Sequence, residues 1–124
     1  MKQFVYIVFL LLSLHVSAQT EKNYGIQFYH GTWKEACDKA KAENKLIFVD
    51  FYTKWCGPCL NMAENVFILP FIGDFYNTNF VNMKIDAENG EGVELAKRYG
   101  VNSYPTYVFV DPKNGDVVHR SKSR

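Results

Sequence analysis

The sequence is short of several features that would assign it to a particular class of protein. It has 3 cysteines in 124 residues, whereas a secreted domain that depends on disulfides usually carries an even set of roughly four or more. Its net charge of +1 leaves no surplus of either sign to attract nucleic acid or a membrane surface. Its apolar run from Phe4 to Leu14 is about half of the roughly 20 residues that a membrane-spanning helix needs. Once these classes are set aside, the sequence is that of a globular protein. Its 48% of hydrophobic residues is typical of a protein with a well-filled core.

The N-terminal residues predict export. Lys2 is followed by the apolar run and then by VSAQ, which fits a signal-peptide cleavage site. We therefore expect a signal peptide at residues 1–18 and a single domain at residues 19–124. The protein would be periplasmic or secreted, with no membrane span after cleavage. An uncleaved membrane anchor is the alternative.

Hydrophobic patterns along the mature chain alternate between strand-like and helix-like segments. Strands are predicted at 26–31, 45–52, 81–87 and 104–112, and helices at 32–45, at 60–80 with a break near Pro70, and at 91–100. A turn at 113–115 predicts a hairpin that leads into a last strand. Thr32 and Glu35 have the spacing of a helix capping box. Strands separated by helices predict an α/β fold with a parallel sheet, to which the hairpin adds an antiparallel edge.

The segment YTKWCGPCLNM, residues 52–62, places two cysteines at the start of a predicted helix. Unpaired backbone N–H groups and the helix dipole stabilise an anion there, so we expect Cys56 to be the reactive thiolate. Cys59, about one helical turn on, can attack the mixed disulfide that Cys56 forms. Gly57 gives the turn conformational room, and Pro58 lacks only an N–H that the first turn leaves unpaired. The spacing favours thiol–disulfide exchange, with no cofactor beyond the Cys56–Cys59 disulfide itself.

Two other uses of this cysteine pair are weaker. A structural zinc site needs a full tetrahedral ligand set, and the mature chain adds only Cys37 and the isolated His30 and His119, so no metal site is expected. A purely structural disulfide would close a very small loop, which gains little stability. Cys37 shares a helix stripe with Trp33 and Ala40, which predicts a core residue; an accessible regulatory thiol is the alternative.

Asp50 stands in the otherwise apolar segment KLIFVDFY, shortly before Cys56. Burial disfavours a charged carboxylate, so we expect the pKa of Asp50 to be raised. A carboxyl group of this kind can accept a proton from Cys59, or return it, when the disulfide opens and closes. The alternative is an exposed acid at a strand edge.

The segments FVDFYTKWCGPC and RYGVNSYPTYVFVDPKNGDVV resemble the thioredoxin family, over essentially the whole mature chain. The export signal is closer to its periplasmic branch, which includes the C-terminal domain of the membrane thiol:disulfide interchange protein. The resemblance implies a thioredoxin-like fold, with a mixed sheet flanked by helices. It makes Cys56 the nucleophile, Cys59 the resolving thiol and Asp50 the acid–base residue.

The resemblance also implies a substrate-binding surface around the cysteines. This surface would comprise Trp55, Gly57, Pro58, Tyr104 and Pro105, with the Tyr104–Pro105 bond in the cis form. A proline at this position offers no N–H, and the exposed backbone beside it can pair with an extended substrate peptide.

The function that the resemblance implies is an exported thiol–disulfide oxidoreductase. Gly57 and Pro58 resemble the residues of the reducing members, so we expect a reductase of protein or peptide disulfides. Its electrons would come from an upstream donor, such as a membrane thiol–disulfide conductor, and no nucleic-acid partner is expected. The alternatives are a non-enzymatic module that binds a peptide or a partner, and a copper or zinc carrier that uses both thiols.

The sequence departs from the family pattern in two places. The lysine that often pairs with the buried acid would fall at Asn82, while Lys84 lies two residues on, on the same strand face. The family fold ends with a helix over one sheet face, whereas this sequence stops at VVHRSKSR. We therefore expect the final helix to be lacking, through truncation or because a partner covers that face.

Overall fold

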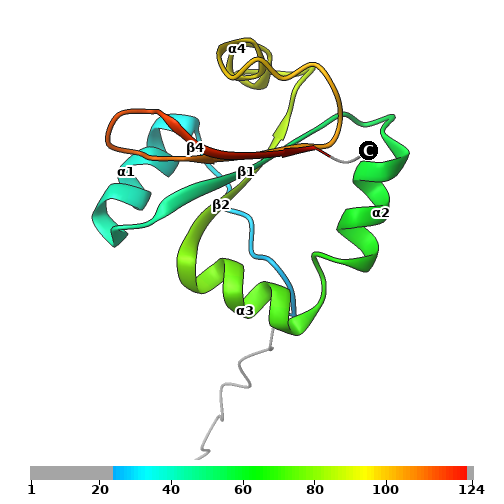
Figure 1. The fold of residues 1–124 in the computed structure, drawn as a ribbon, viewed down its shortest axis with the longest axis horizontal. Helices are drawn as coiled ribbons and strands as arrows, with labels where there is room; N and C mark the ends of the chain where they lie inside the picture. Colours follow the sequence, from blue (N-terminus) through cyan, green and yellow to red (C-terminus); the bar gives the residue numbers. More distant parts are fainter. Residues whose placement is uncertain (1–23, 123–124) are drawn as a thin grey trace, which may run out of the picture.

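The computed structural model describes residues 24–122, so the predicted signal peptide at residues 1–18 lies outside the described residues. The elements follow in the order α1 (Trp33–Glu43), β1 (Leu46–Tyr52), α2 (Gly57–Asn65), α3 (Pro70–Asn79), β2 (Phe80–Asp86), α4 (Gly92–Arg98), β3 (Thr106–Val110) and β4 (Val117–Lys122). The predicted helix break near Pro70 is confirmed, because Pro70 begins α3. Helices lie on both sides of a mixed four-stranded sheet, which confirms the predicted α/β fold (Figure 1).

The sheet has the strand order β2-β1-β3-β4. β2 runs parallel to β1, but β3 runs antiparallel to β1, and β4 antiparallel to β3. The predicted parallel orientation of the strand at 104–112 is therefore wrong. The helix before it is short: α4 has 7 residues and rises about 10 Å, whereas β2, also of 7 residues, spans roughly 23 Å. The chain therefore re-enters the sheet from the end at which β2 finishes.

The predicted strand at 26–31 is also wrong. The segment forms a single parallel bridge, between Phe28 and Asn82 at the edge of β2. Its other backbone N–H groups bond elsewhere: that of Ile26 donates to the carbonyl of Phe67, and that of Gln27 to the Asn77 side chain. Contacts with α3 and with the residues before it thus replace the continuous ladder that a strand requires.

One sheet face is covered by α1 and α4. Alternate residues of β1 point to this face and pack against both helices in one buried cluster, which includes Ala36, Ala40, Ile47, Val49, Phe51, Leu95 and Ala96. The predicted capping box begins α1: the Glu35 N–H donates to the Thr32 hydroxyl oxygen at 3.1 Å, and the Glu35 carboxylate accepts from the Thr32 N–H. Local sequence therefore determines where α1 starts.

The opposite face carries Phe48, Asp50 and Tyr52, and it is covered by α2 and α3. The Phe48 ring packs edge-on against Tyr76 of α3, with centroids 4.8 Å apart, and against Phe67 at 6.2 Å. Figure 1 shows α4 above the sheet and α3 below it. This division places Asp50 on the face that the cysteine-bearing helix covers.

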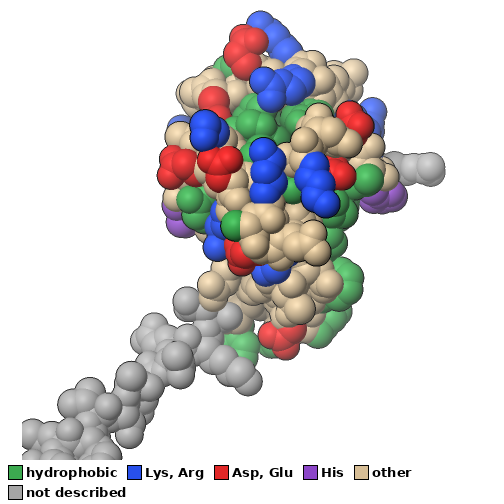
Figure 2. Space-filling model, turned by 90° about the vertical axis from the view of Figure 1, so that its left-hand side faces the viewer, with side chains coloured by type: hydrophobic (Ala, Val, Ile, Leu, Met, Phe, Trp, Pro, Cys, Tyr) green, Lys and Arg blue, Asp and Glu red, His purple; other side chains and the backbone are tan. Residues whose placement is uncertain are grey.

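Charges of both signs are intermixed on the side of the molecule shown in Figure 2. Two exposed ion pairs lie along α1, Lys34–Asp38 at 2.8 Å and Lys39–Glu43 at 2.9 Å. Exposed pairs of this kind add little to stability, so the core carries the fold. Within residues 24–122, no helix combines the length and the apolar character that crossing a bilayer demands.

Candidate active site

Cys56 occupies the N-cap of α2, directly after the turn that follows β1. Its Sγ accepts a hydrogen bond from the backbone N–H of Cys59 at 3.1 Å. Pro58 lies in the first turn, where its missing N–H costs nothing. The position of Cys56 at the helix start is thus as predicted, and the N–H groups of that turn are the donors that would stabilise a thiolate.

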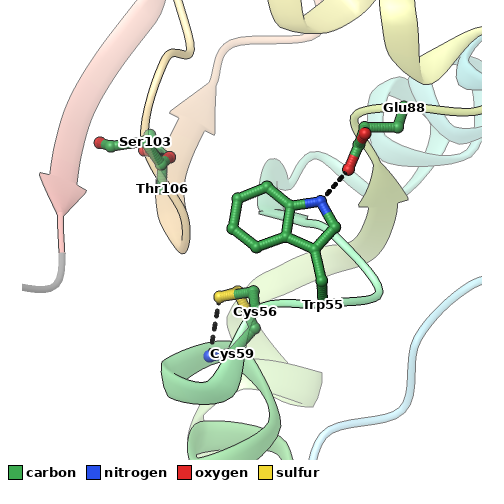
Figure 3. Close-up of a disulfide and its surroundings, with 6 residues drawn as sticks. All are labelled: Trp55, Cys56, Cys59, Glu88, Ser103 and Thr106. Carbon is green, nitrogen blue, oxygen red and sulfur yellow. Dashed lines mark hydrogen bonds between the residues drawn. A yellow bond between two sulfur atoms is a disulfide. The ribbon is translucent and has the colours of Figure 1, made fainter.

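Cys56 and Cys59 form a disulfide, with their Cα atoms 5.3 Å apart (Figure 3). Their exposed fractions, 6% and 5%, do not distinguish the two sulfurs. The capping contact does, because it is Cys56 whose sulfur receives the helix N–H. This contact favours Cys56 as the attacking group and Cys59 as the resolving group.

We expected the turn to need glycine at position 57 for its backbone conformation, and the structure shows that it does not. Gly57 does not adopt a left-handed backbone, and a Cβ at this position would meet no atom within 4 Å. The surface in front of the disulfide is therefore open at Gly57. What glycine offers here is space beside the sulfurs rather than backbone freedom.

Asp50 is 1% exposed and lies in β1, which is hydrogen-bonded on both sides. This excludes the alternative of an exposed acid at a strand edge. Burial raises the pKa of Asp50 to about 6, and the nearby Lys84 ammonium opposes that rise. Lys84 is the parallel partner of Asp50 in β2, but it is exposed and lies over the Tyr52 ring, 5.0 Å from its centroid. Lys84 therefore limits the rise in the pKa of Asp50 but does not cancel it.

The turn before β3 forms the other side of the site. The Tyr104–Pro105 peptide bond is cis, as the resemblance implied, and Pro105 is fully buried. The Thr106 hydroxyl donates to the Ser103 carbonyl at 2.7 Å, which closes the turn. Because β3 starts at the edge where β1 ends, this turn lies at the same end of the sheet as the disulfide (Figure 3).

Trp55 is held in place although it is 71% exposed. Its indole N–H donates to the Glu88 carboxylate (Figure 3). Its ring packs edge-on against Tyr104, with centroids 6.0 Å apart and planes at 89°. Two loops far apart in the sequence thus orient one exposed aromatic ring beside the disulfide, which suits a surface for an apolar side chain of a substrate.

Glu88 is a site residue that the sequence analysis missed. It follows β2 in a turn that Asp86 organises, since the Asp86 carboxylate accepts from the Glu88 N–H at 2.9 Å and from the Asn89 side chain at 2.8 Å. The available signal was an acidic DAEN segment directly after a strand, at the sheet edge where β1 also ends. Acids at such an edge can reach the residues of the neighbouring loop.

Cys37 is half-buried on α1 and packs against the core cluster rather than lying within it. Burial raises the pKa of its thiol. This thiol is therefore less reactive than a free one at neutral pH, which leaves the disulfide as the redox pair.

The comparisons with known proteins agree with this geometry. The profile of the thioredoxin-like family matches residues 27–112. The chain belongs to the thioredoxin-like family. In a thioredoxin-family fold, a Cys56–Cys59 disulfide at a helix start supports dithiol–disulfide exchange in the general sense.

Three individual proteins show how similar the chain is to known members of the family. Thioredoxin-1 of Drosophila yakuba is 46% identical over 69 residues, 56% of this chain and 60% of that protein. Thioredoxin H4 of Arabidopsis thaliana is 36% identical over 88 residues, 71% of this chain and 68% of that protein. The solution structure of a candidate disulphide-isomerase from Bacteroides thetaiotaomicron has a TM-score of 0.73 and 45% identity, and the match covers 83% of this chain and 84% of that one.

Proposed function

We propose that this thioredoxin-family chain is an exported reductase of protein or peptide disulfides. The observation that carries the proposal is the Cys56 sulfur at the N-cap of α2, with Cys59 one turn on and the buried Asp50 on the sheet face that α2 covers. Export rests on the signal-peptide pattern of residues 1–18. The substrate would lie against Trp55, Gly57 and the turn at Tyr104–Pro105.

The proposed reaction has two exchanges. The Cys56 thiolate attacks one sulfur of the substrate disulfide, and the other substrate sulfur leaves as a thiolate that takes up a proton. Cys59 then gives its proton to the Asp50 carboxylate, and its sulfur attacks Cys56 in the mixed disulfide. The second substrate sulfur leaves as a thiolate and is protonated, by Asp50 or by water. The substrate gains two electrons and two protons, and the enzyme ends as the Cys56–Cys59 disulfide.

Reduced enzyme needs a source of electrons for each turnover. We propose a membrane thiol–disulfide conductor as that donor, because the protein would act outside the cytoplasm, where disulfides form readily. Neither a metal nor an organic cofactor enters the reaction as proposed, and nucleic acid has no part in it.

A thiol-trapping experiment tests the proposal. The pre-reduced full chain is mixed with a protein disulfide, and the species are quenched with an alkylating reagent and weighed. Wild type should reduce the substrate, Cys59→Ser should accumulate a mixed disulfide through Cys56, and Cys56→Ser should do neither. Cys37→Ser is the matched control and should behave as wild type. Absence of both turnover and a trapped species would contradict the enzyme and favour a binding module.

A further inference from the structure

Asp50 and Tyr107 are direct partners across the antiparallel pair of β1 and β3. Partnered residues point to the same face of a sheet, with Cβ atoms about 5 Å apart. Each has a buried oxygen, Asp50 Oδ1 and the Tyr107 hydroxyl, that finds no hydrogen-bond partner within residues 24–122. Buried polar atoms without a partner are uncommon and costly, and here an unpaired donor and an unpaired acceptor belong to two residues that are partners across the sheet.

The surroundings of Tyr107 are apolar on most sides. Its ring lies 5.8 Å from Phe48 and 5.9 Å from Phe67, centroid to centroid. It also lines a groove of about 260 Å³ between the sheet and α2, which Asp50 does not line. A tyrosine in such a position is held by ring packing, so its hydroxyl is held in place on the sheet face that also carries Asp50.

Other ionisable or polar groups face this pair from each neighbouring element. They are Tyr52 on β1, Lys84 on β2, Cys59 on α2, Tyr76 on α3, and two residues of β4, His119 and Ser121, of which Ser121 is the direct partner of Tyr107. Lys84 and His119 are exposed, and no side chain among the described residues donates to the free Asp50 oxygen. Thr53, in the turn after β1, has the other hydroxyl that is buried without a partner, and it is therefore the natural control.

We propose that Tyr107 is a positioning residue for proton transfer: its phenol donates a hydrogen bond to a bridging water, which in turn donates to the Asp50 carboxylate and stabilises the ionised form that accepts the Cys59 proton. This inference rests on the proposed function for its role in the reaction. Tyr107 keeps its own proton throughout, because burial and the nearby Asp50 raise the pKa of its phenol. Only the proton of Cys59 moves, to Asp50 and then away.

The test is a titration of the Asp50 carboxyl carbon by NMR in the oxidised full chain, without substrate. Removing a hydrogen bond to an ionised carboxylate should raise the pKa of Asp50 in Tyr107→Phe by about one unit, a tenfold change in its proton affinity. Thr53→Val, which also removes a buried hydroxyl, should leave that pKa within about 0.3 units of wild type. Both variants keep the size of the side chain, and thermal unfolding checks that they fold.

The outcomes separate this inference from the proposed function. A rise in the pKa of Asp50 confined to Tyr107→Phe supports the inference, even if wild type reduces no substrate. A shift that is absent, downward or equal in Thr53→Val overturns it, even if wild type is an active reductase. In an active enzyme, the pH midpoint of the second exchange should also move upward in Tyr107→Phe, whereas a loss of packing alone would lower the rate without moving the midpoint.

Discussion

Glu88 accepts the indole hydrogen of Trp55 from the far side of the site, so a loop after β2 determines how an aromatic ring beside the disulfide is oriented. Most of this ring is open to solvent, and without the hydrogen bond only the edge-on contact with Tyr104 would restrain it. An oriented ring loses less entropy when a substrate packs on it. If the proposed substrate packs on this ring, the acid should affect substrate affinity without touching a sulfur.

We expect Glu88→Ala to raise KM for a protein disulfide by about fivefold, which corresponds to about 1 kcal/mol for one solvent-exposed hydrogen bond to a charged group. The rate of the chemical step should change little. Glu88→Gln keeps an acceptor oxygen and should restore most of the affinity. Glu94→Ala removes an exposed acid of α4 that pairs with Lys97 instead, and it should have no effect. Steady-state kinetics and the indole N–H chemical shift measure these changes; an unmoved shift in Glu88→Ala would contradict the contact.

Asp50 should make the folded state less stable as the pH rises. Its pKa is about 6 in the fold and about 3.9 in the unfolded chain, so the folded state binds more protons between these values. Stability therefore falls as the pH rises from about 4 to about 6, and it is constant above that range. Asp50→Asn should be more stable than wild type at pH 7 by about 2–3 kcal/mol and should lose this advantage below about pH 4.

The same substitution should slow the second exchange, because the side-chain amide that replaces the carboxylate cannot accept the proton of Cys59. Urea unfolding at pH 4 and pH 7 measures the first effect, and single-turnover kinetics measure the second. Asp74→Asn changes an exposed acid on α3 and serves as the control. Equal stability of Asp50→Asn and wild type at both pH values would show that burial does not raise the pKa of Asp50.

Gly92 and Gly57 offer a contrast between two glycines at the starts of helices. A Cβ on Gly92 would lie 1.8 Å from the backbone oxygen of Asp86, whereas a Cβ on Gly57 would meet nothing within 4 Å. Gly92→Ala should therefore lower the free energy of unfolding by about 3 kcal/mol through overpacking against rigid backbone. Gly57→Ala should change it by less than about 0.5 kcal/mol. Chemical denaturation of both variants decides this, and similar losses in the two would refute the steric argument.

Export predicts a defined mature terminus. Protein recovered from outside the cytoplasm of an expressing bacterium should begin at Gln19 and lack the first 18 residues. N-terminal sequencing by mass spectrometry checks this. Replacing Leu11 and Leu12 with lysine should interrupt the apolar run and leave full-length protein inside the cell. A mature form that still begins at Met1 in the membrane fraction would favour the uncleaved anchor.

What could be predicted from the sequence depended on the range of the interactions involved. The capping box of Thr32 and Glu35 acts over only three residues. The N-cap position of Cys56 requires only that a strand be followed by a helix. Both could therefore be predicted from the sequence. The burial of Asp50 could be predicted because a single acid in an otherwise apolar strand has few explanations. The cis bond before Pro105 came from family resemblance, since its neighbours alone favour the trans form.

The wrong or missing predictions all concern residues whose contacts are with residues far away in the sequence. The direction of β3 depends on how far α4 carries the chain back, which a helical pattern does not reveal. Residues 26–31 look like a strand, but bonds to Phe67 and Asn77 take up their N–H groups. Glu88 and Tyr107 could not be singled out from the sequence, because only the folded sheet brings Glu88 to Trp55 and places Tyr107 opposite Asp50.

The brevity of α4 has a consequence for the candidate active site. Two more turns in that helix could carry the chain back to the opposite rim of the sheet, and the strand that follows would then end, rather than begin, beside the sulfurs. The proline turn would be exchanged for whatever follows residue 110. A core-facing helix of 7 residues thus sets which loop lies beside the disulfide, so insertions of whole turns in it should replace the proline turn at that position.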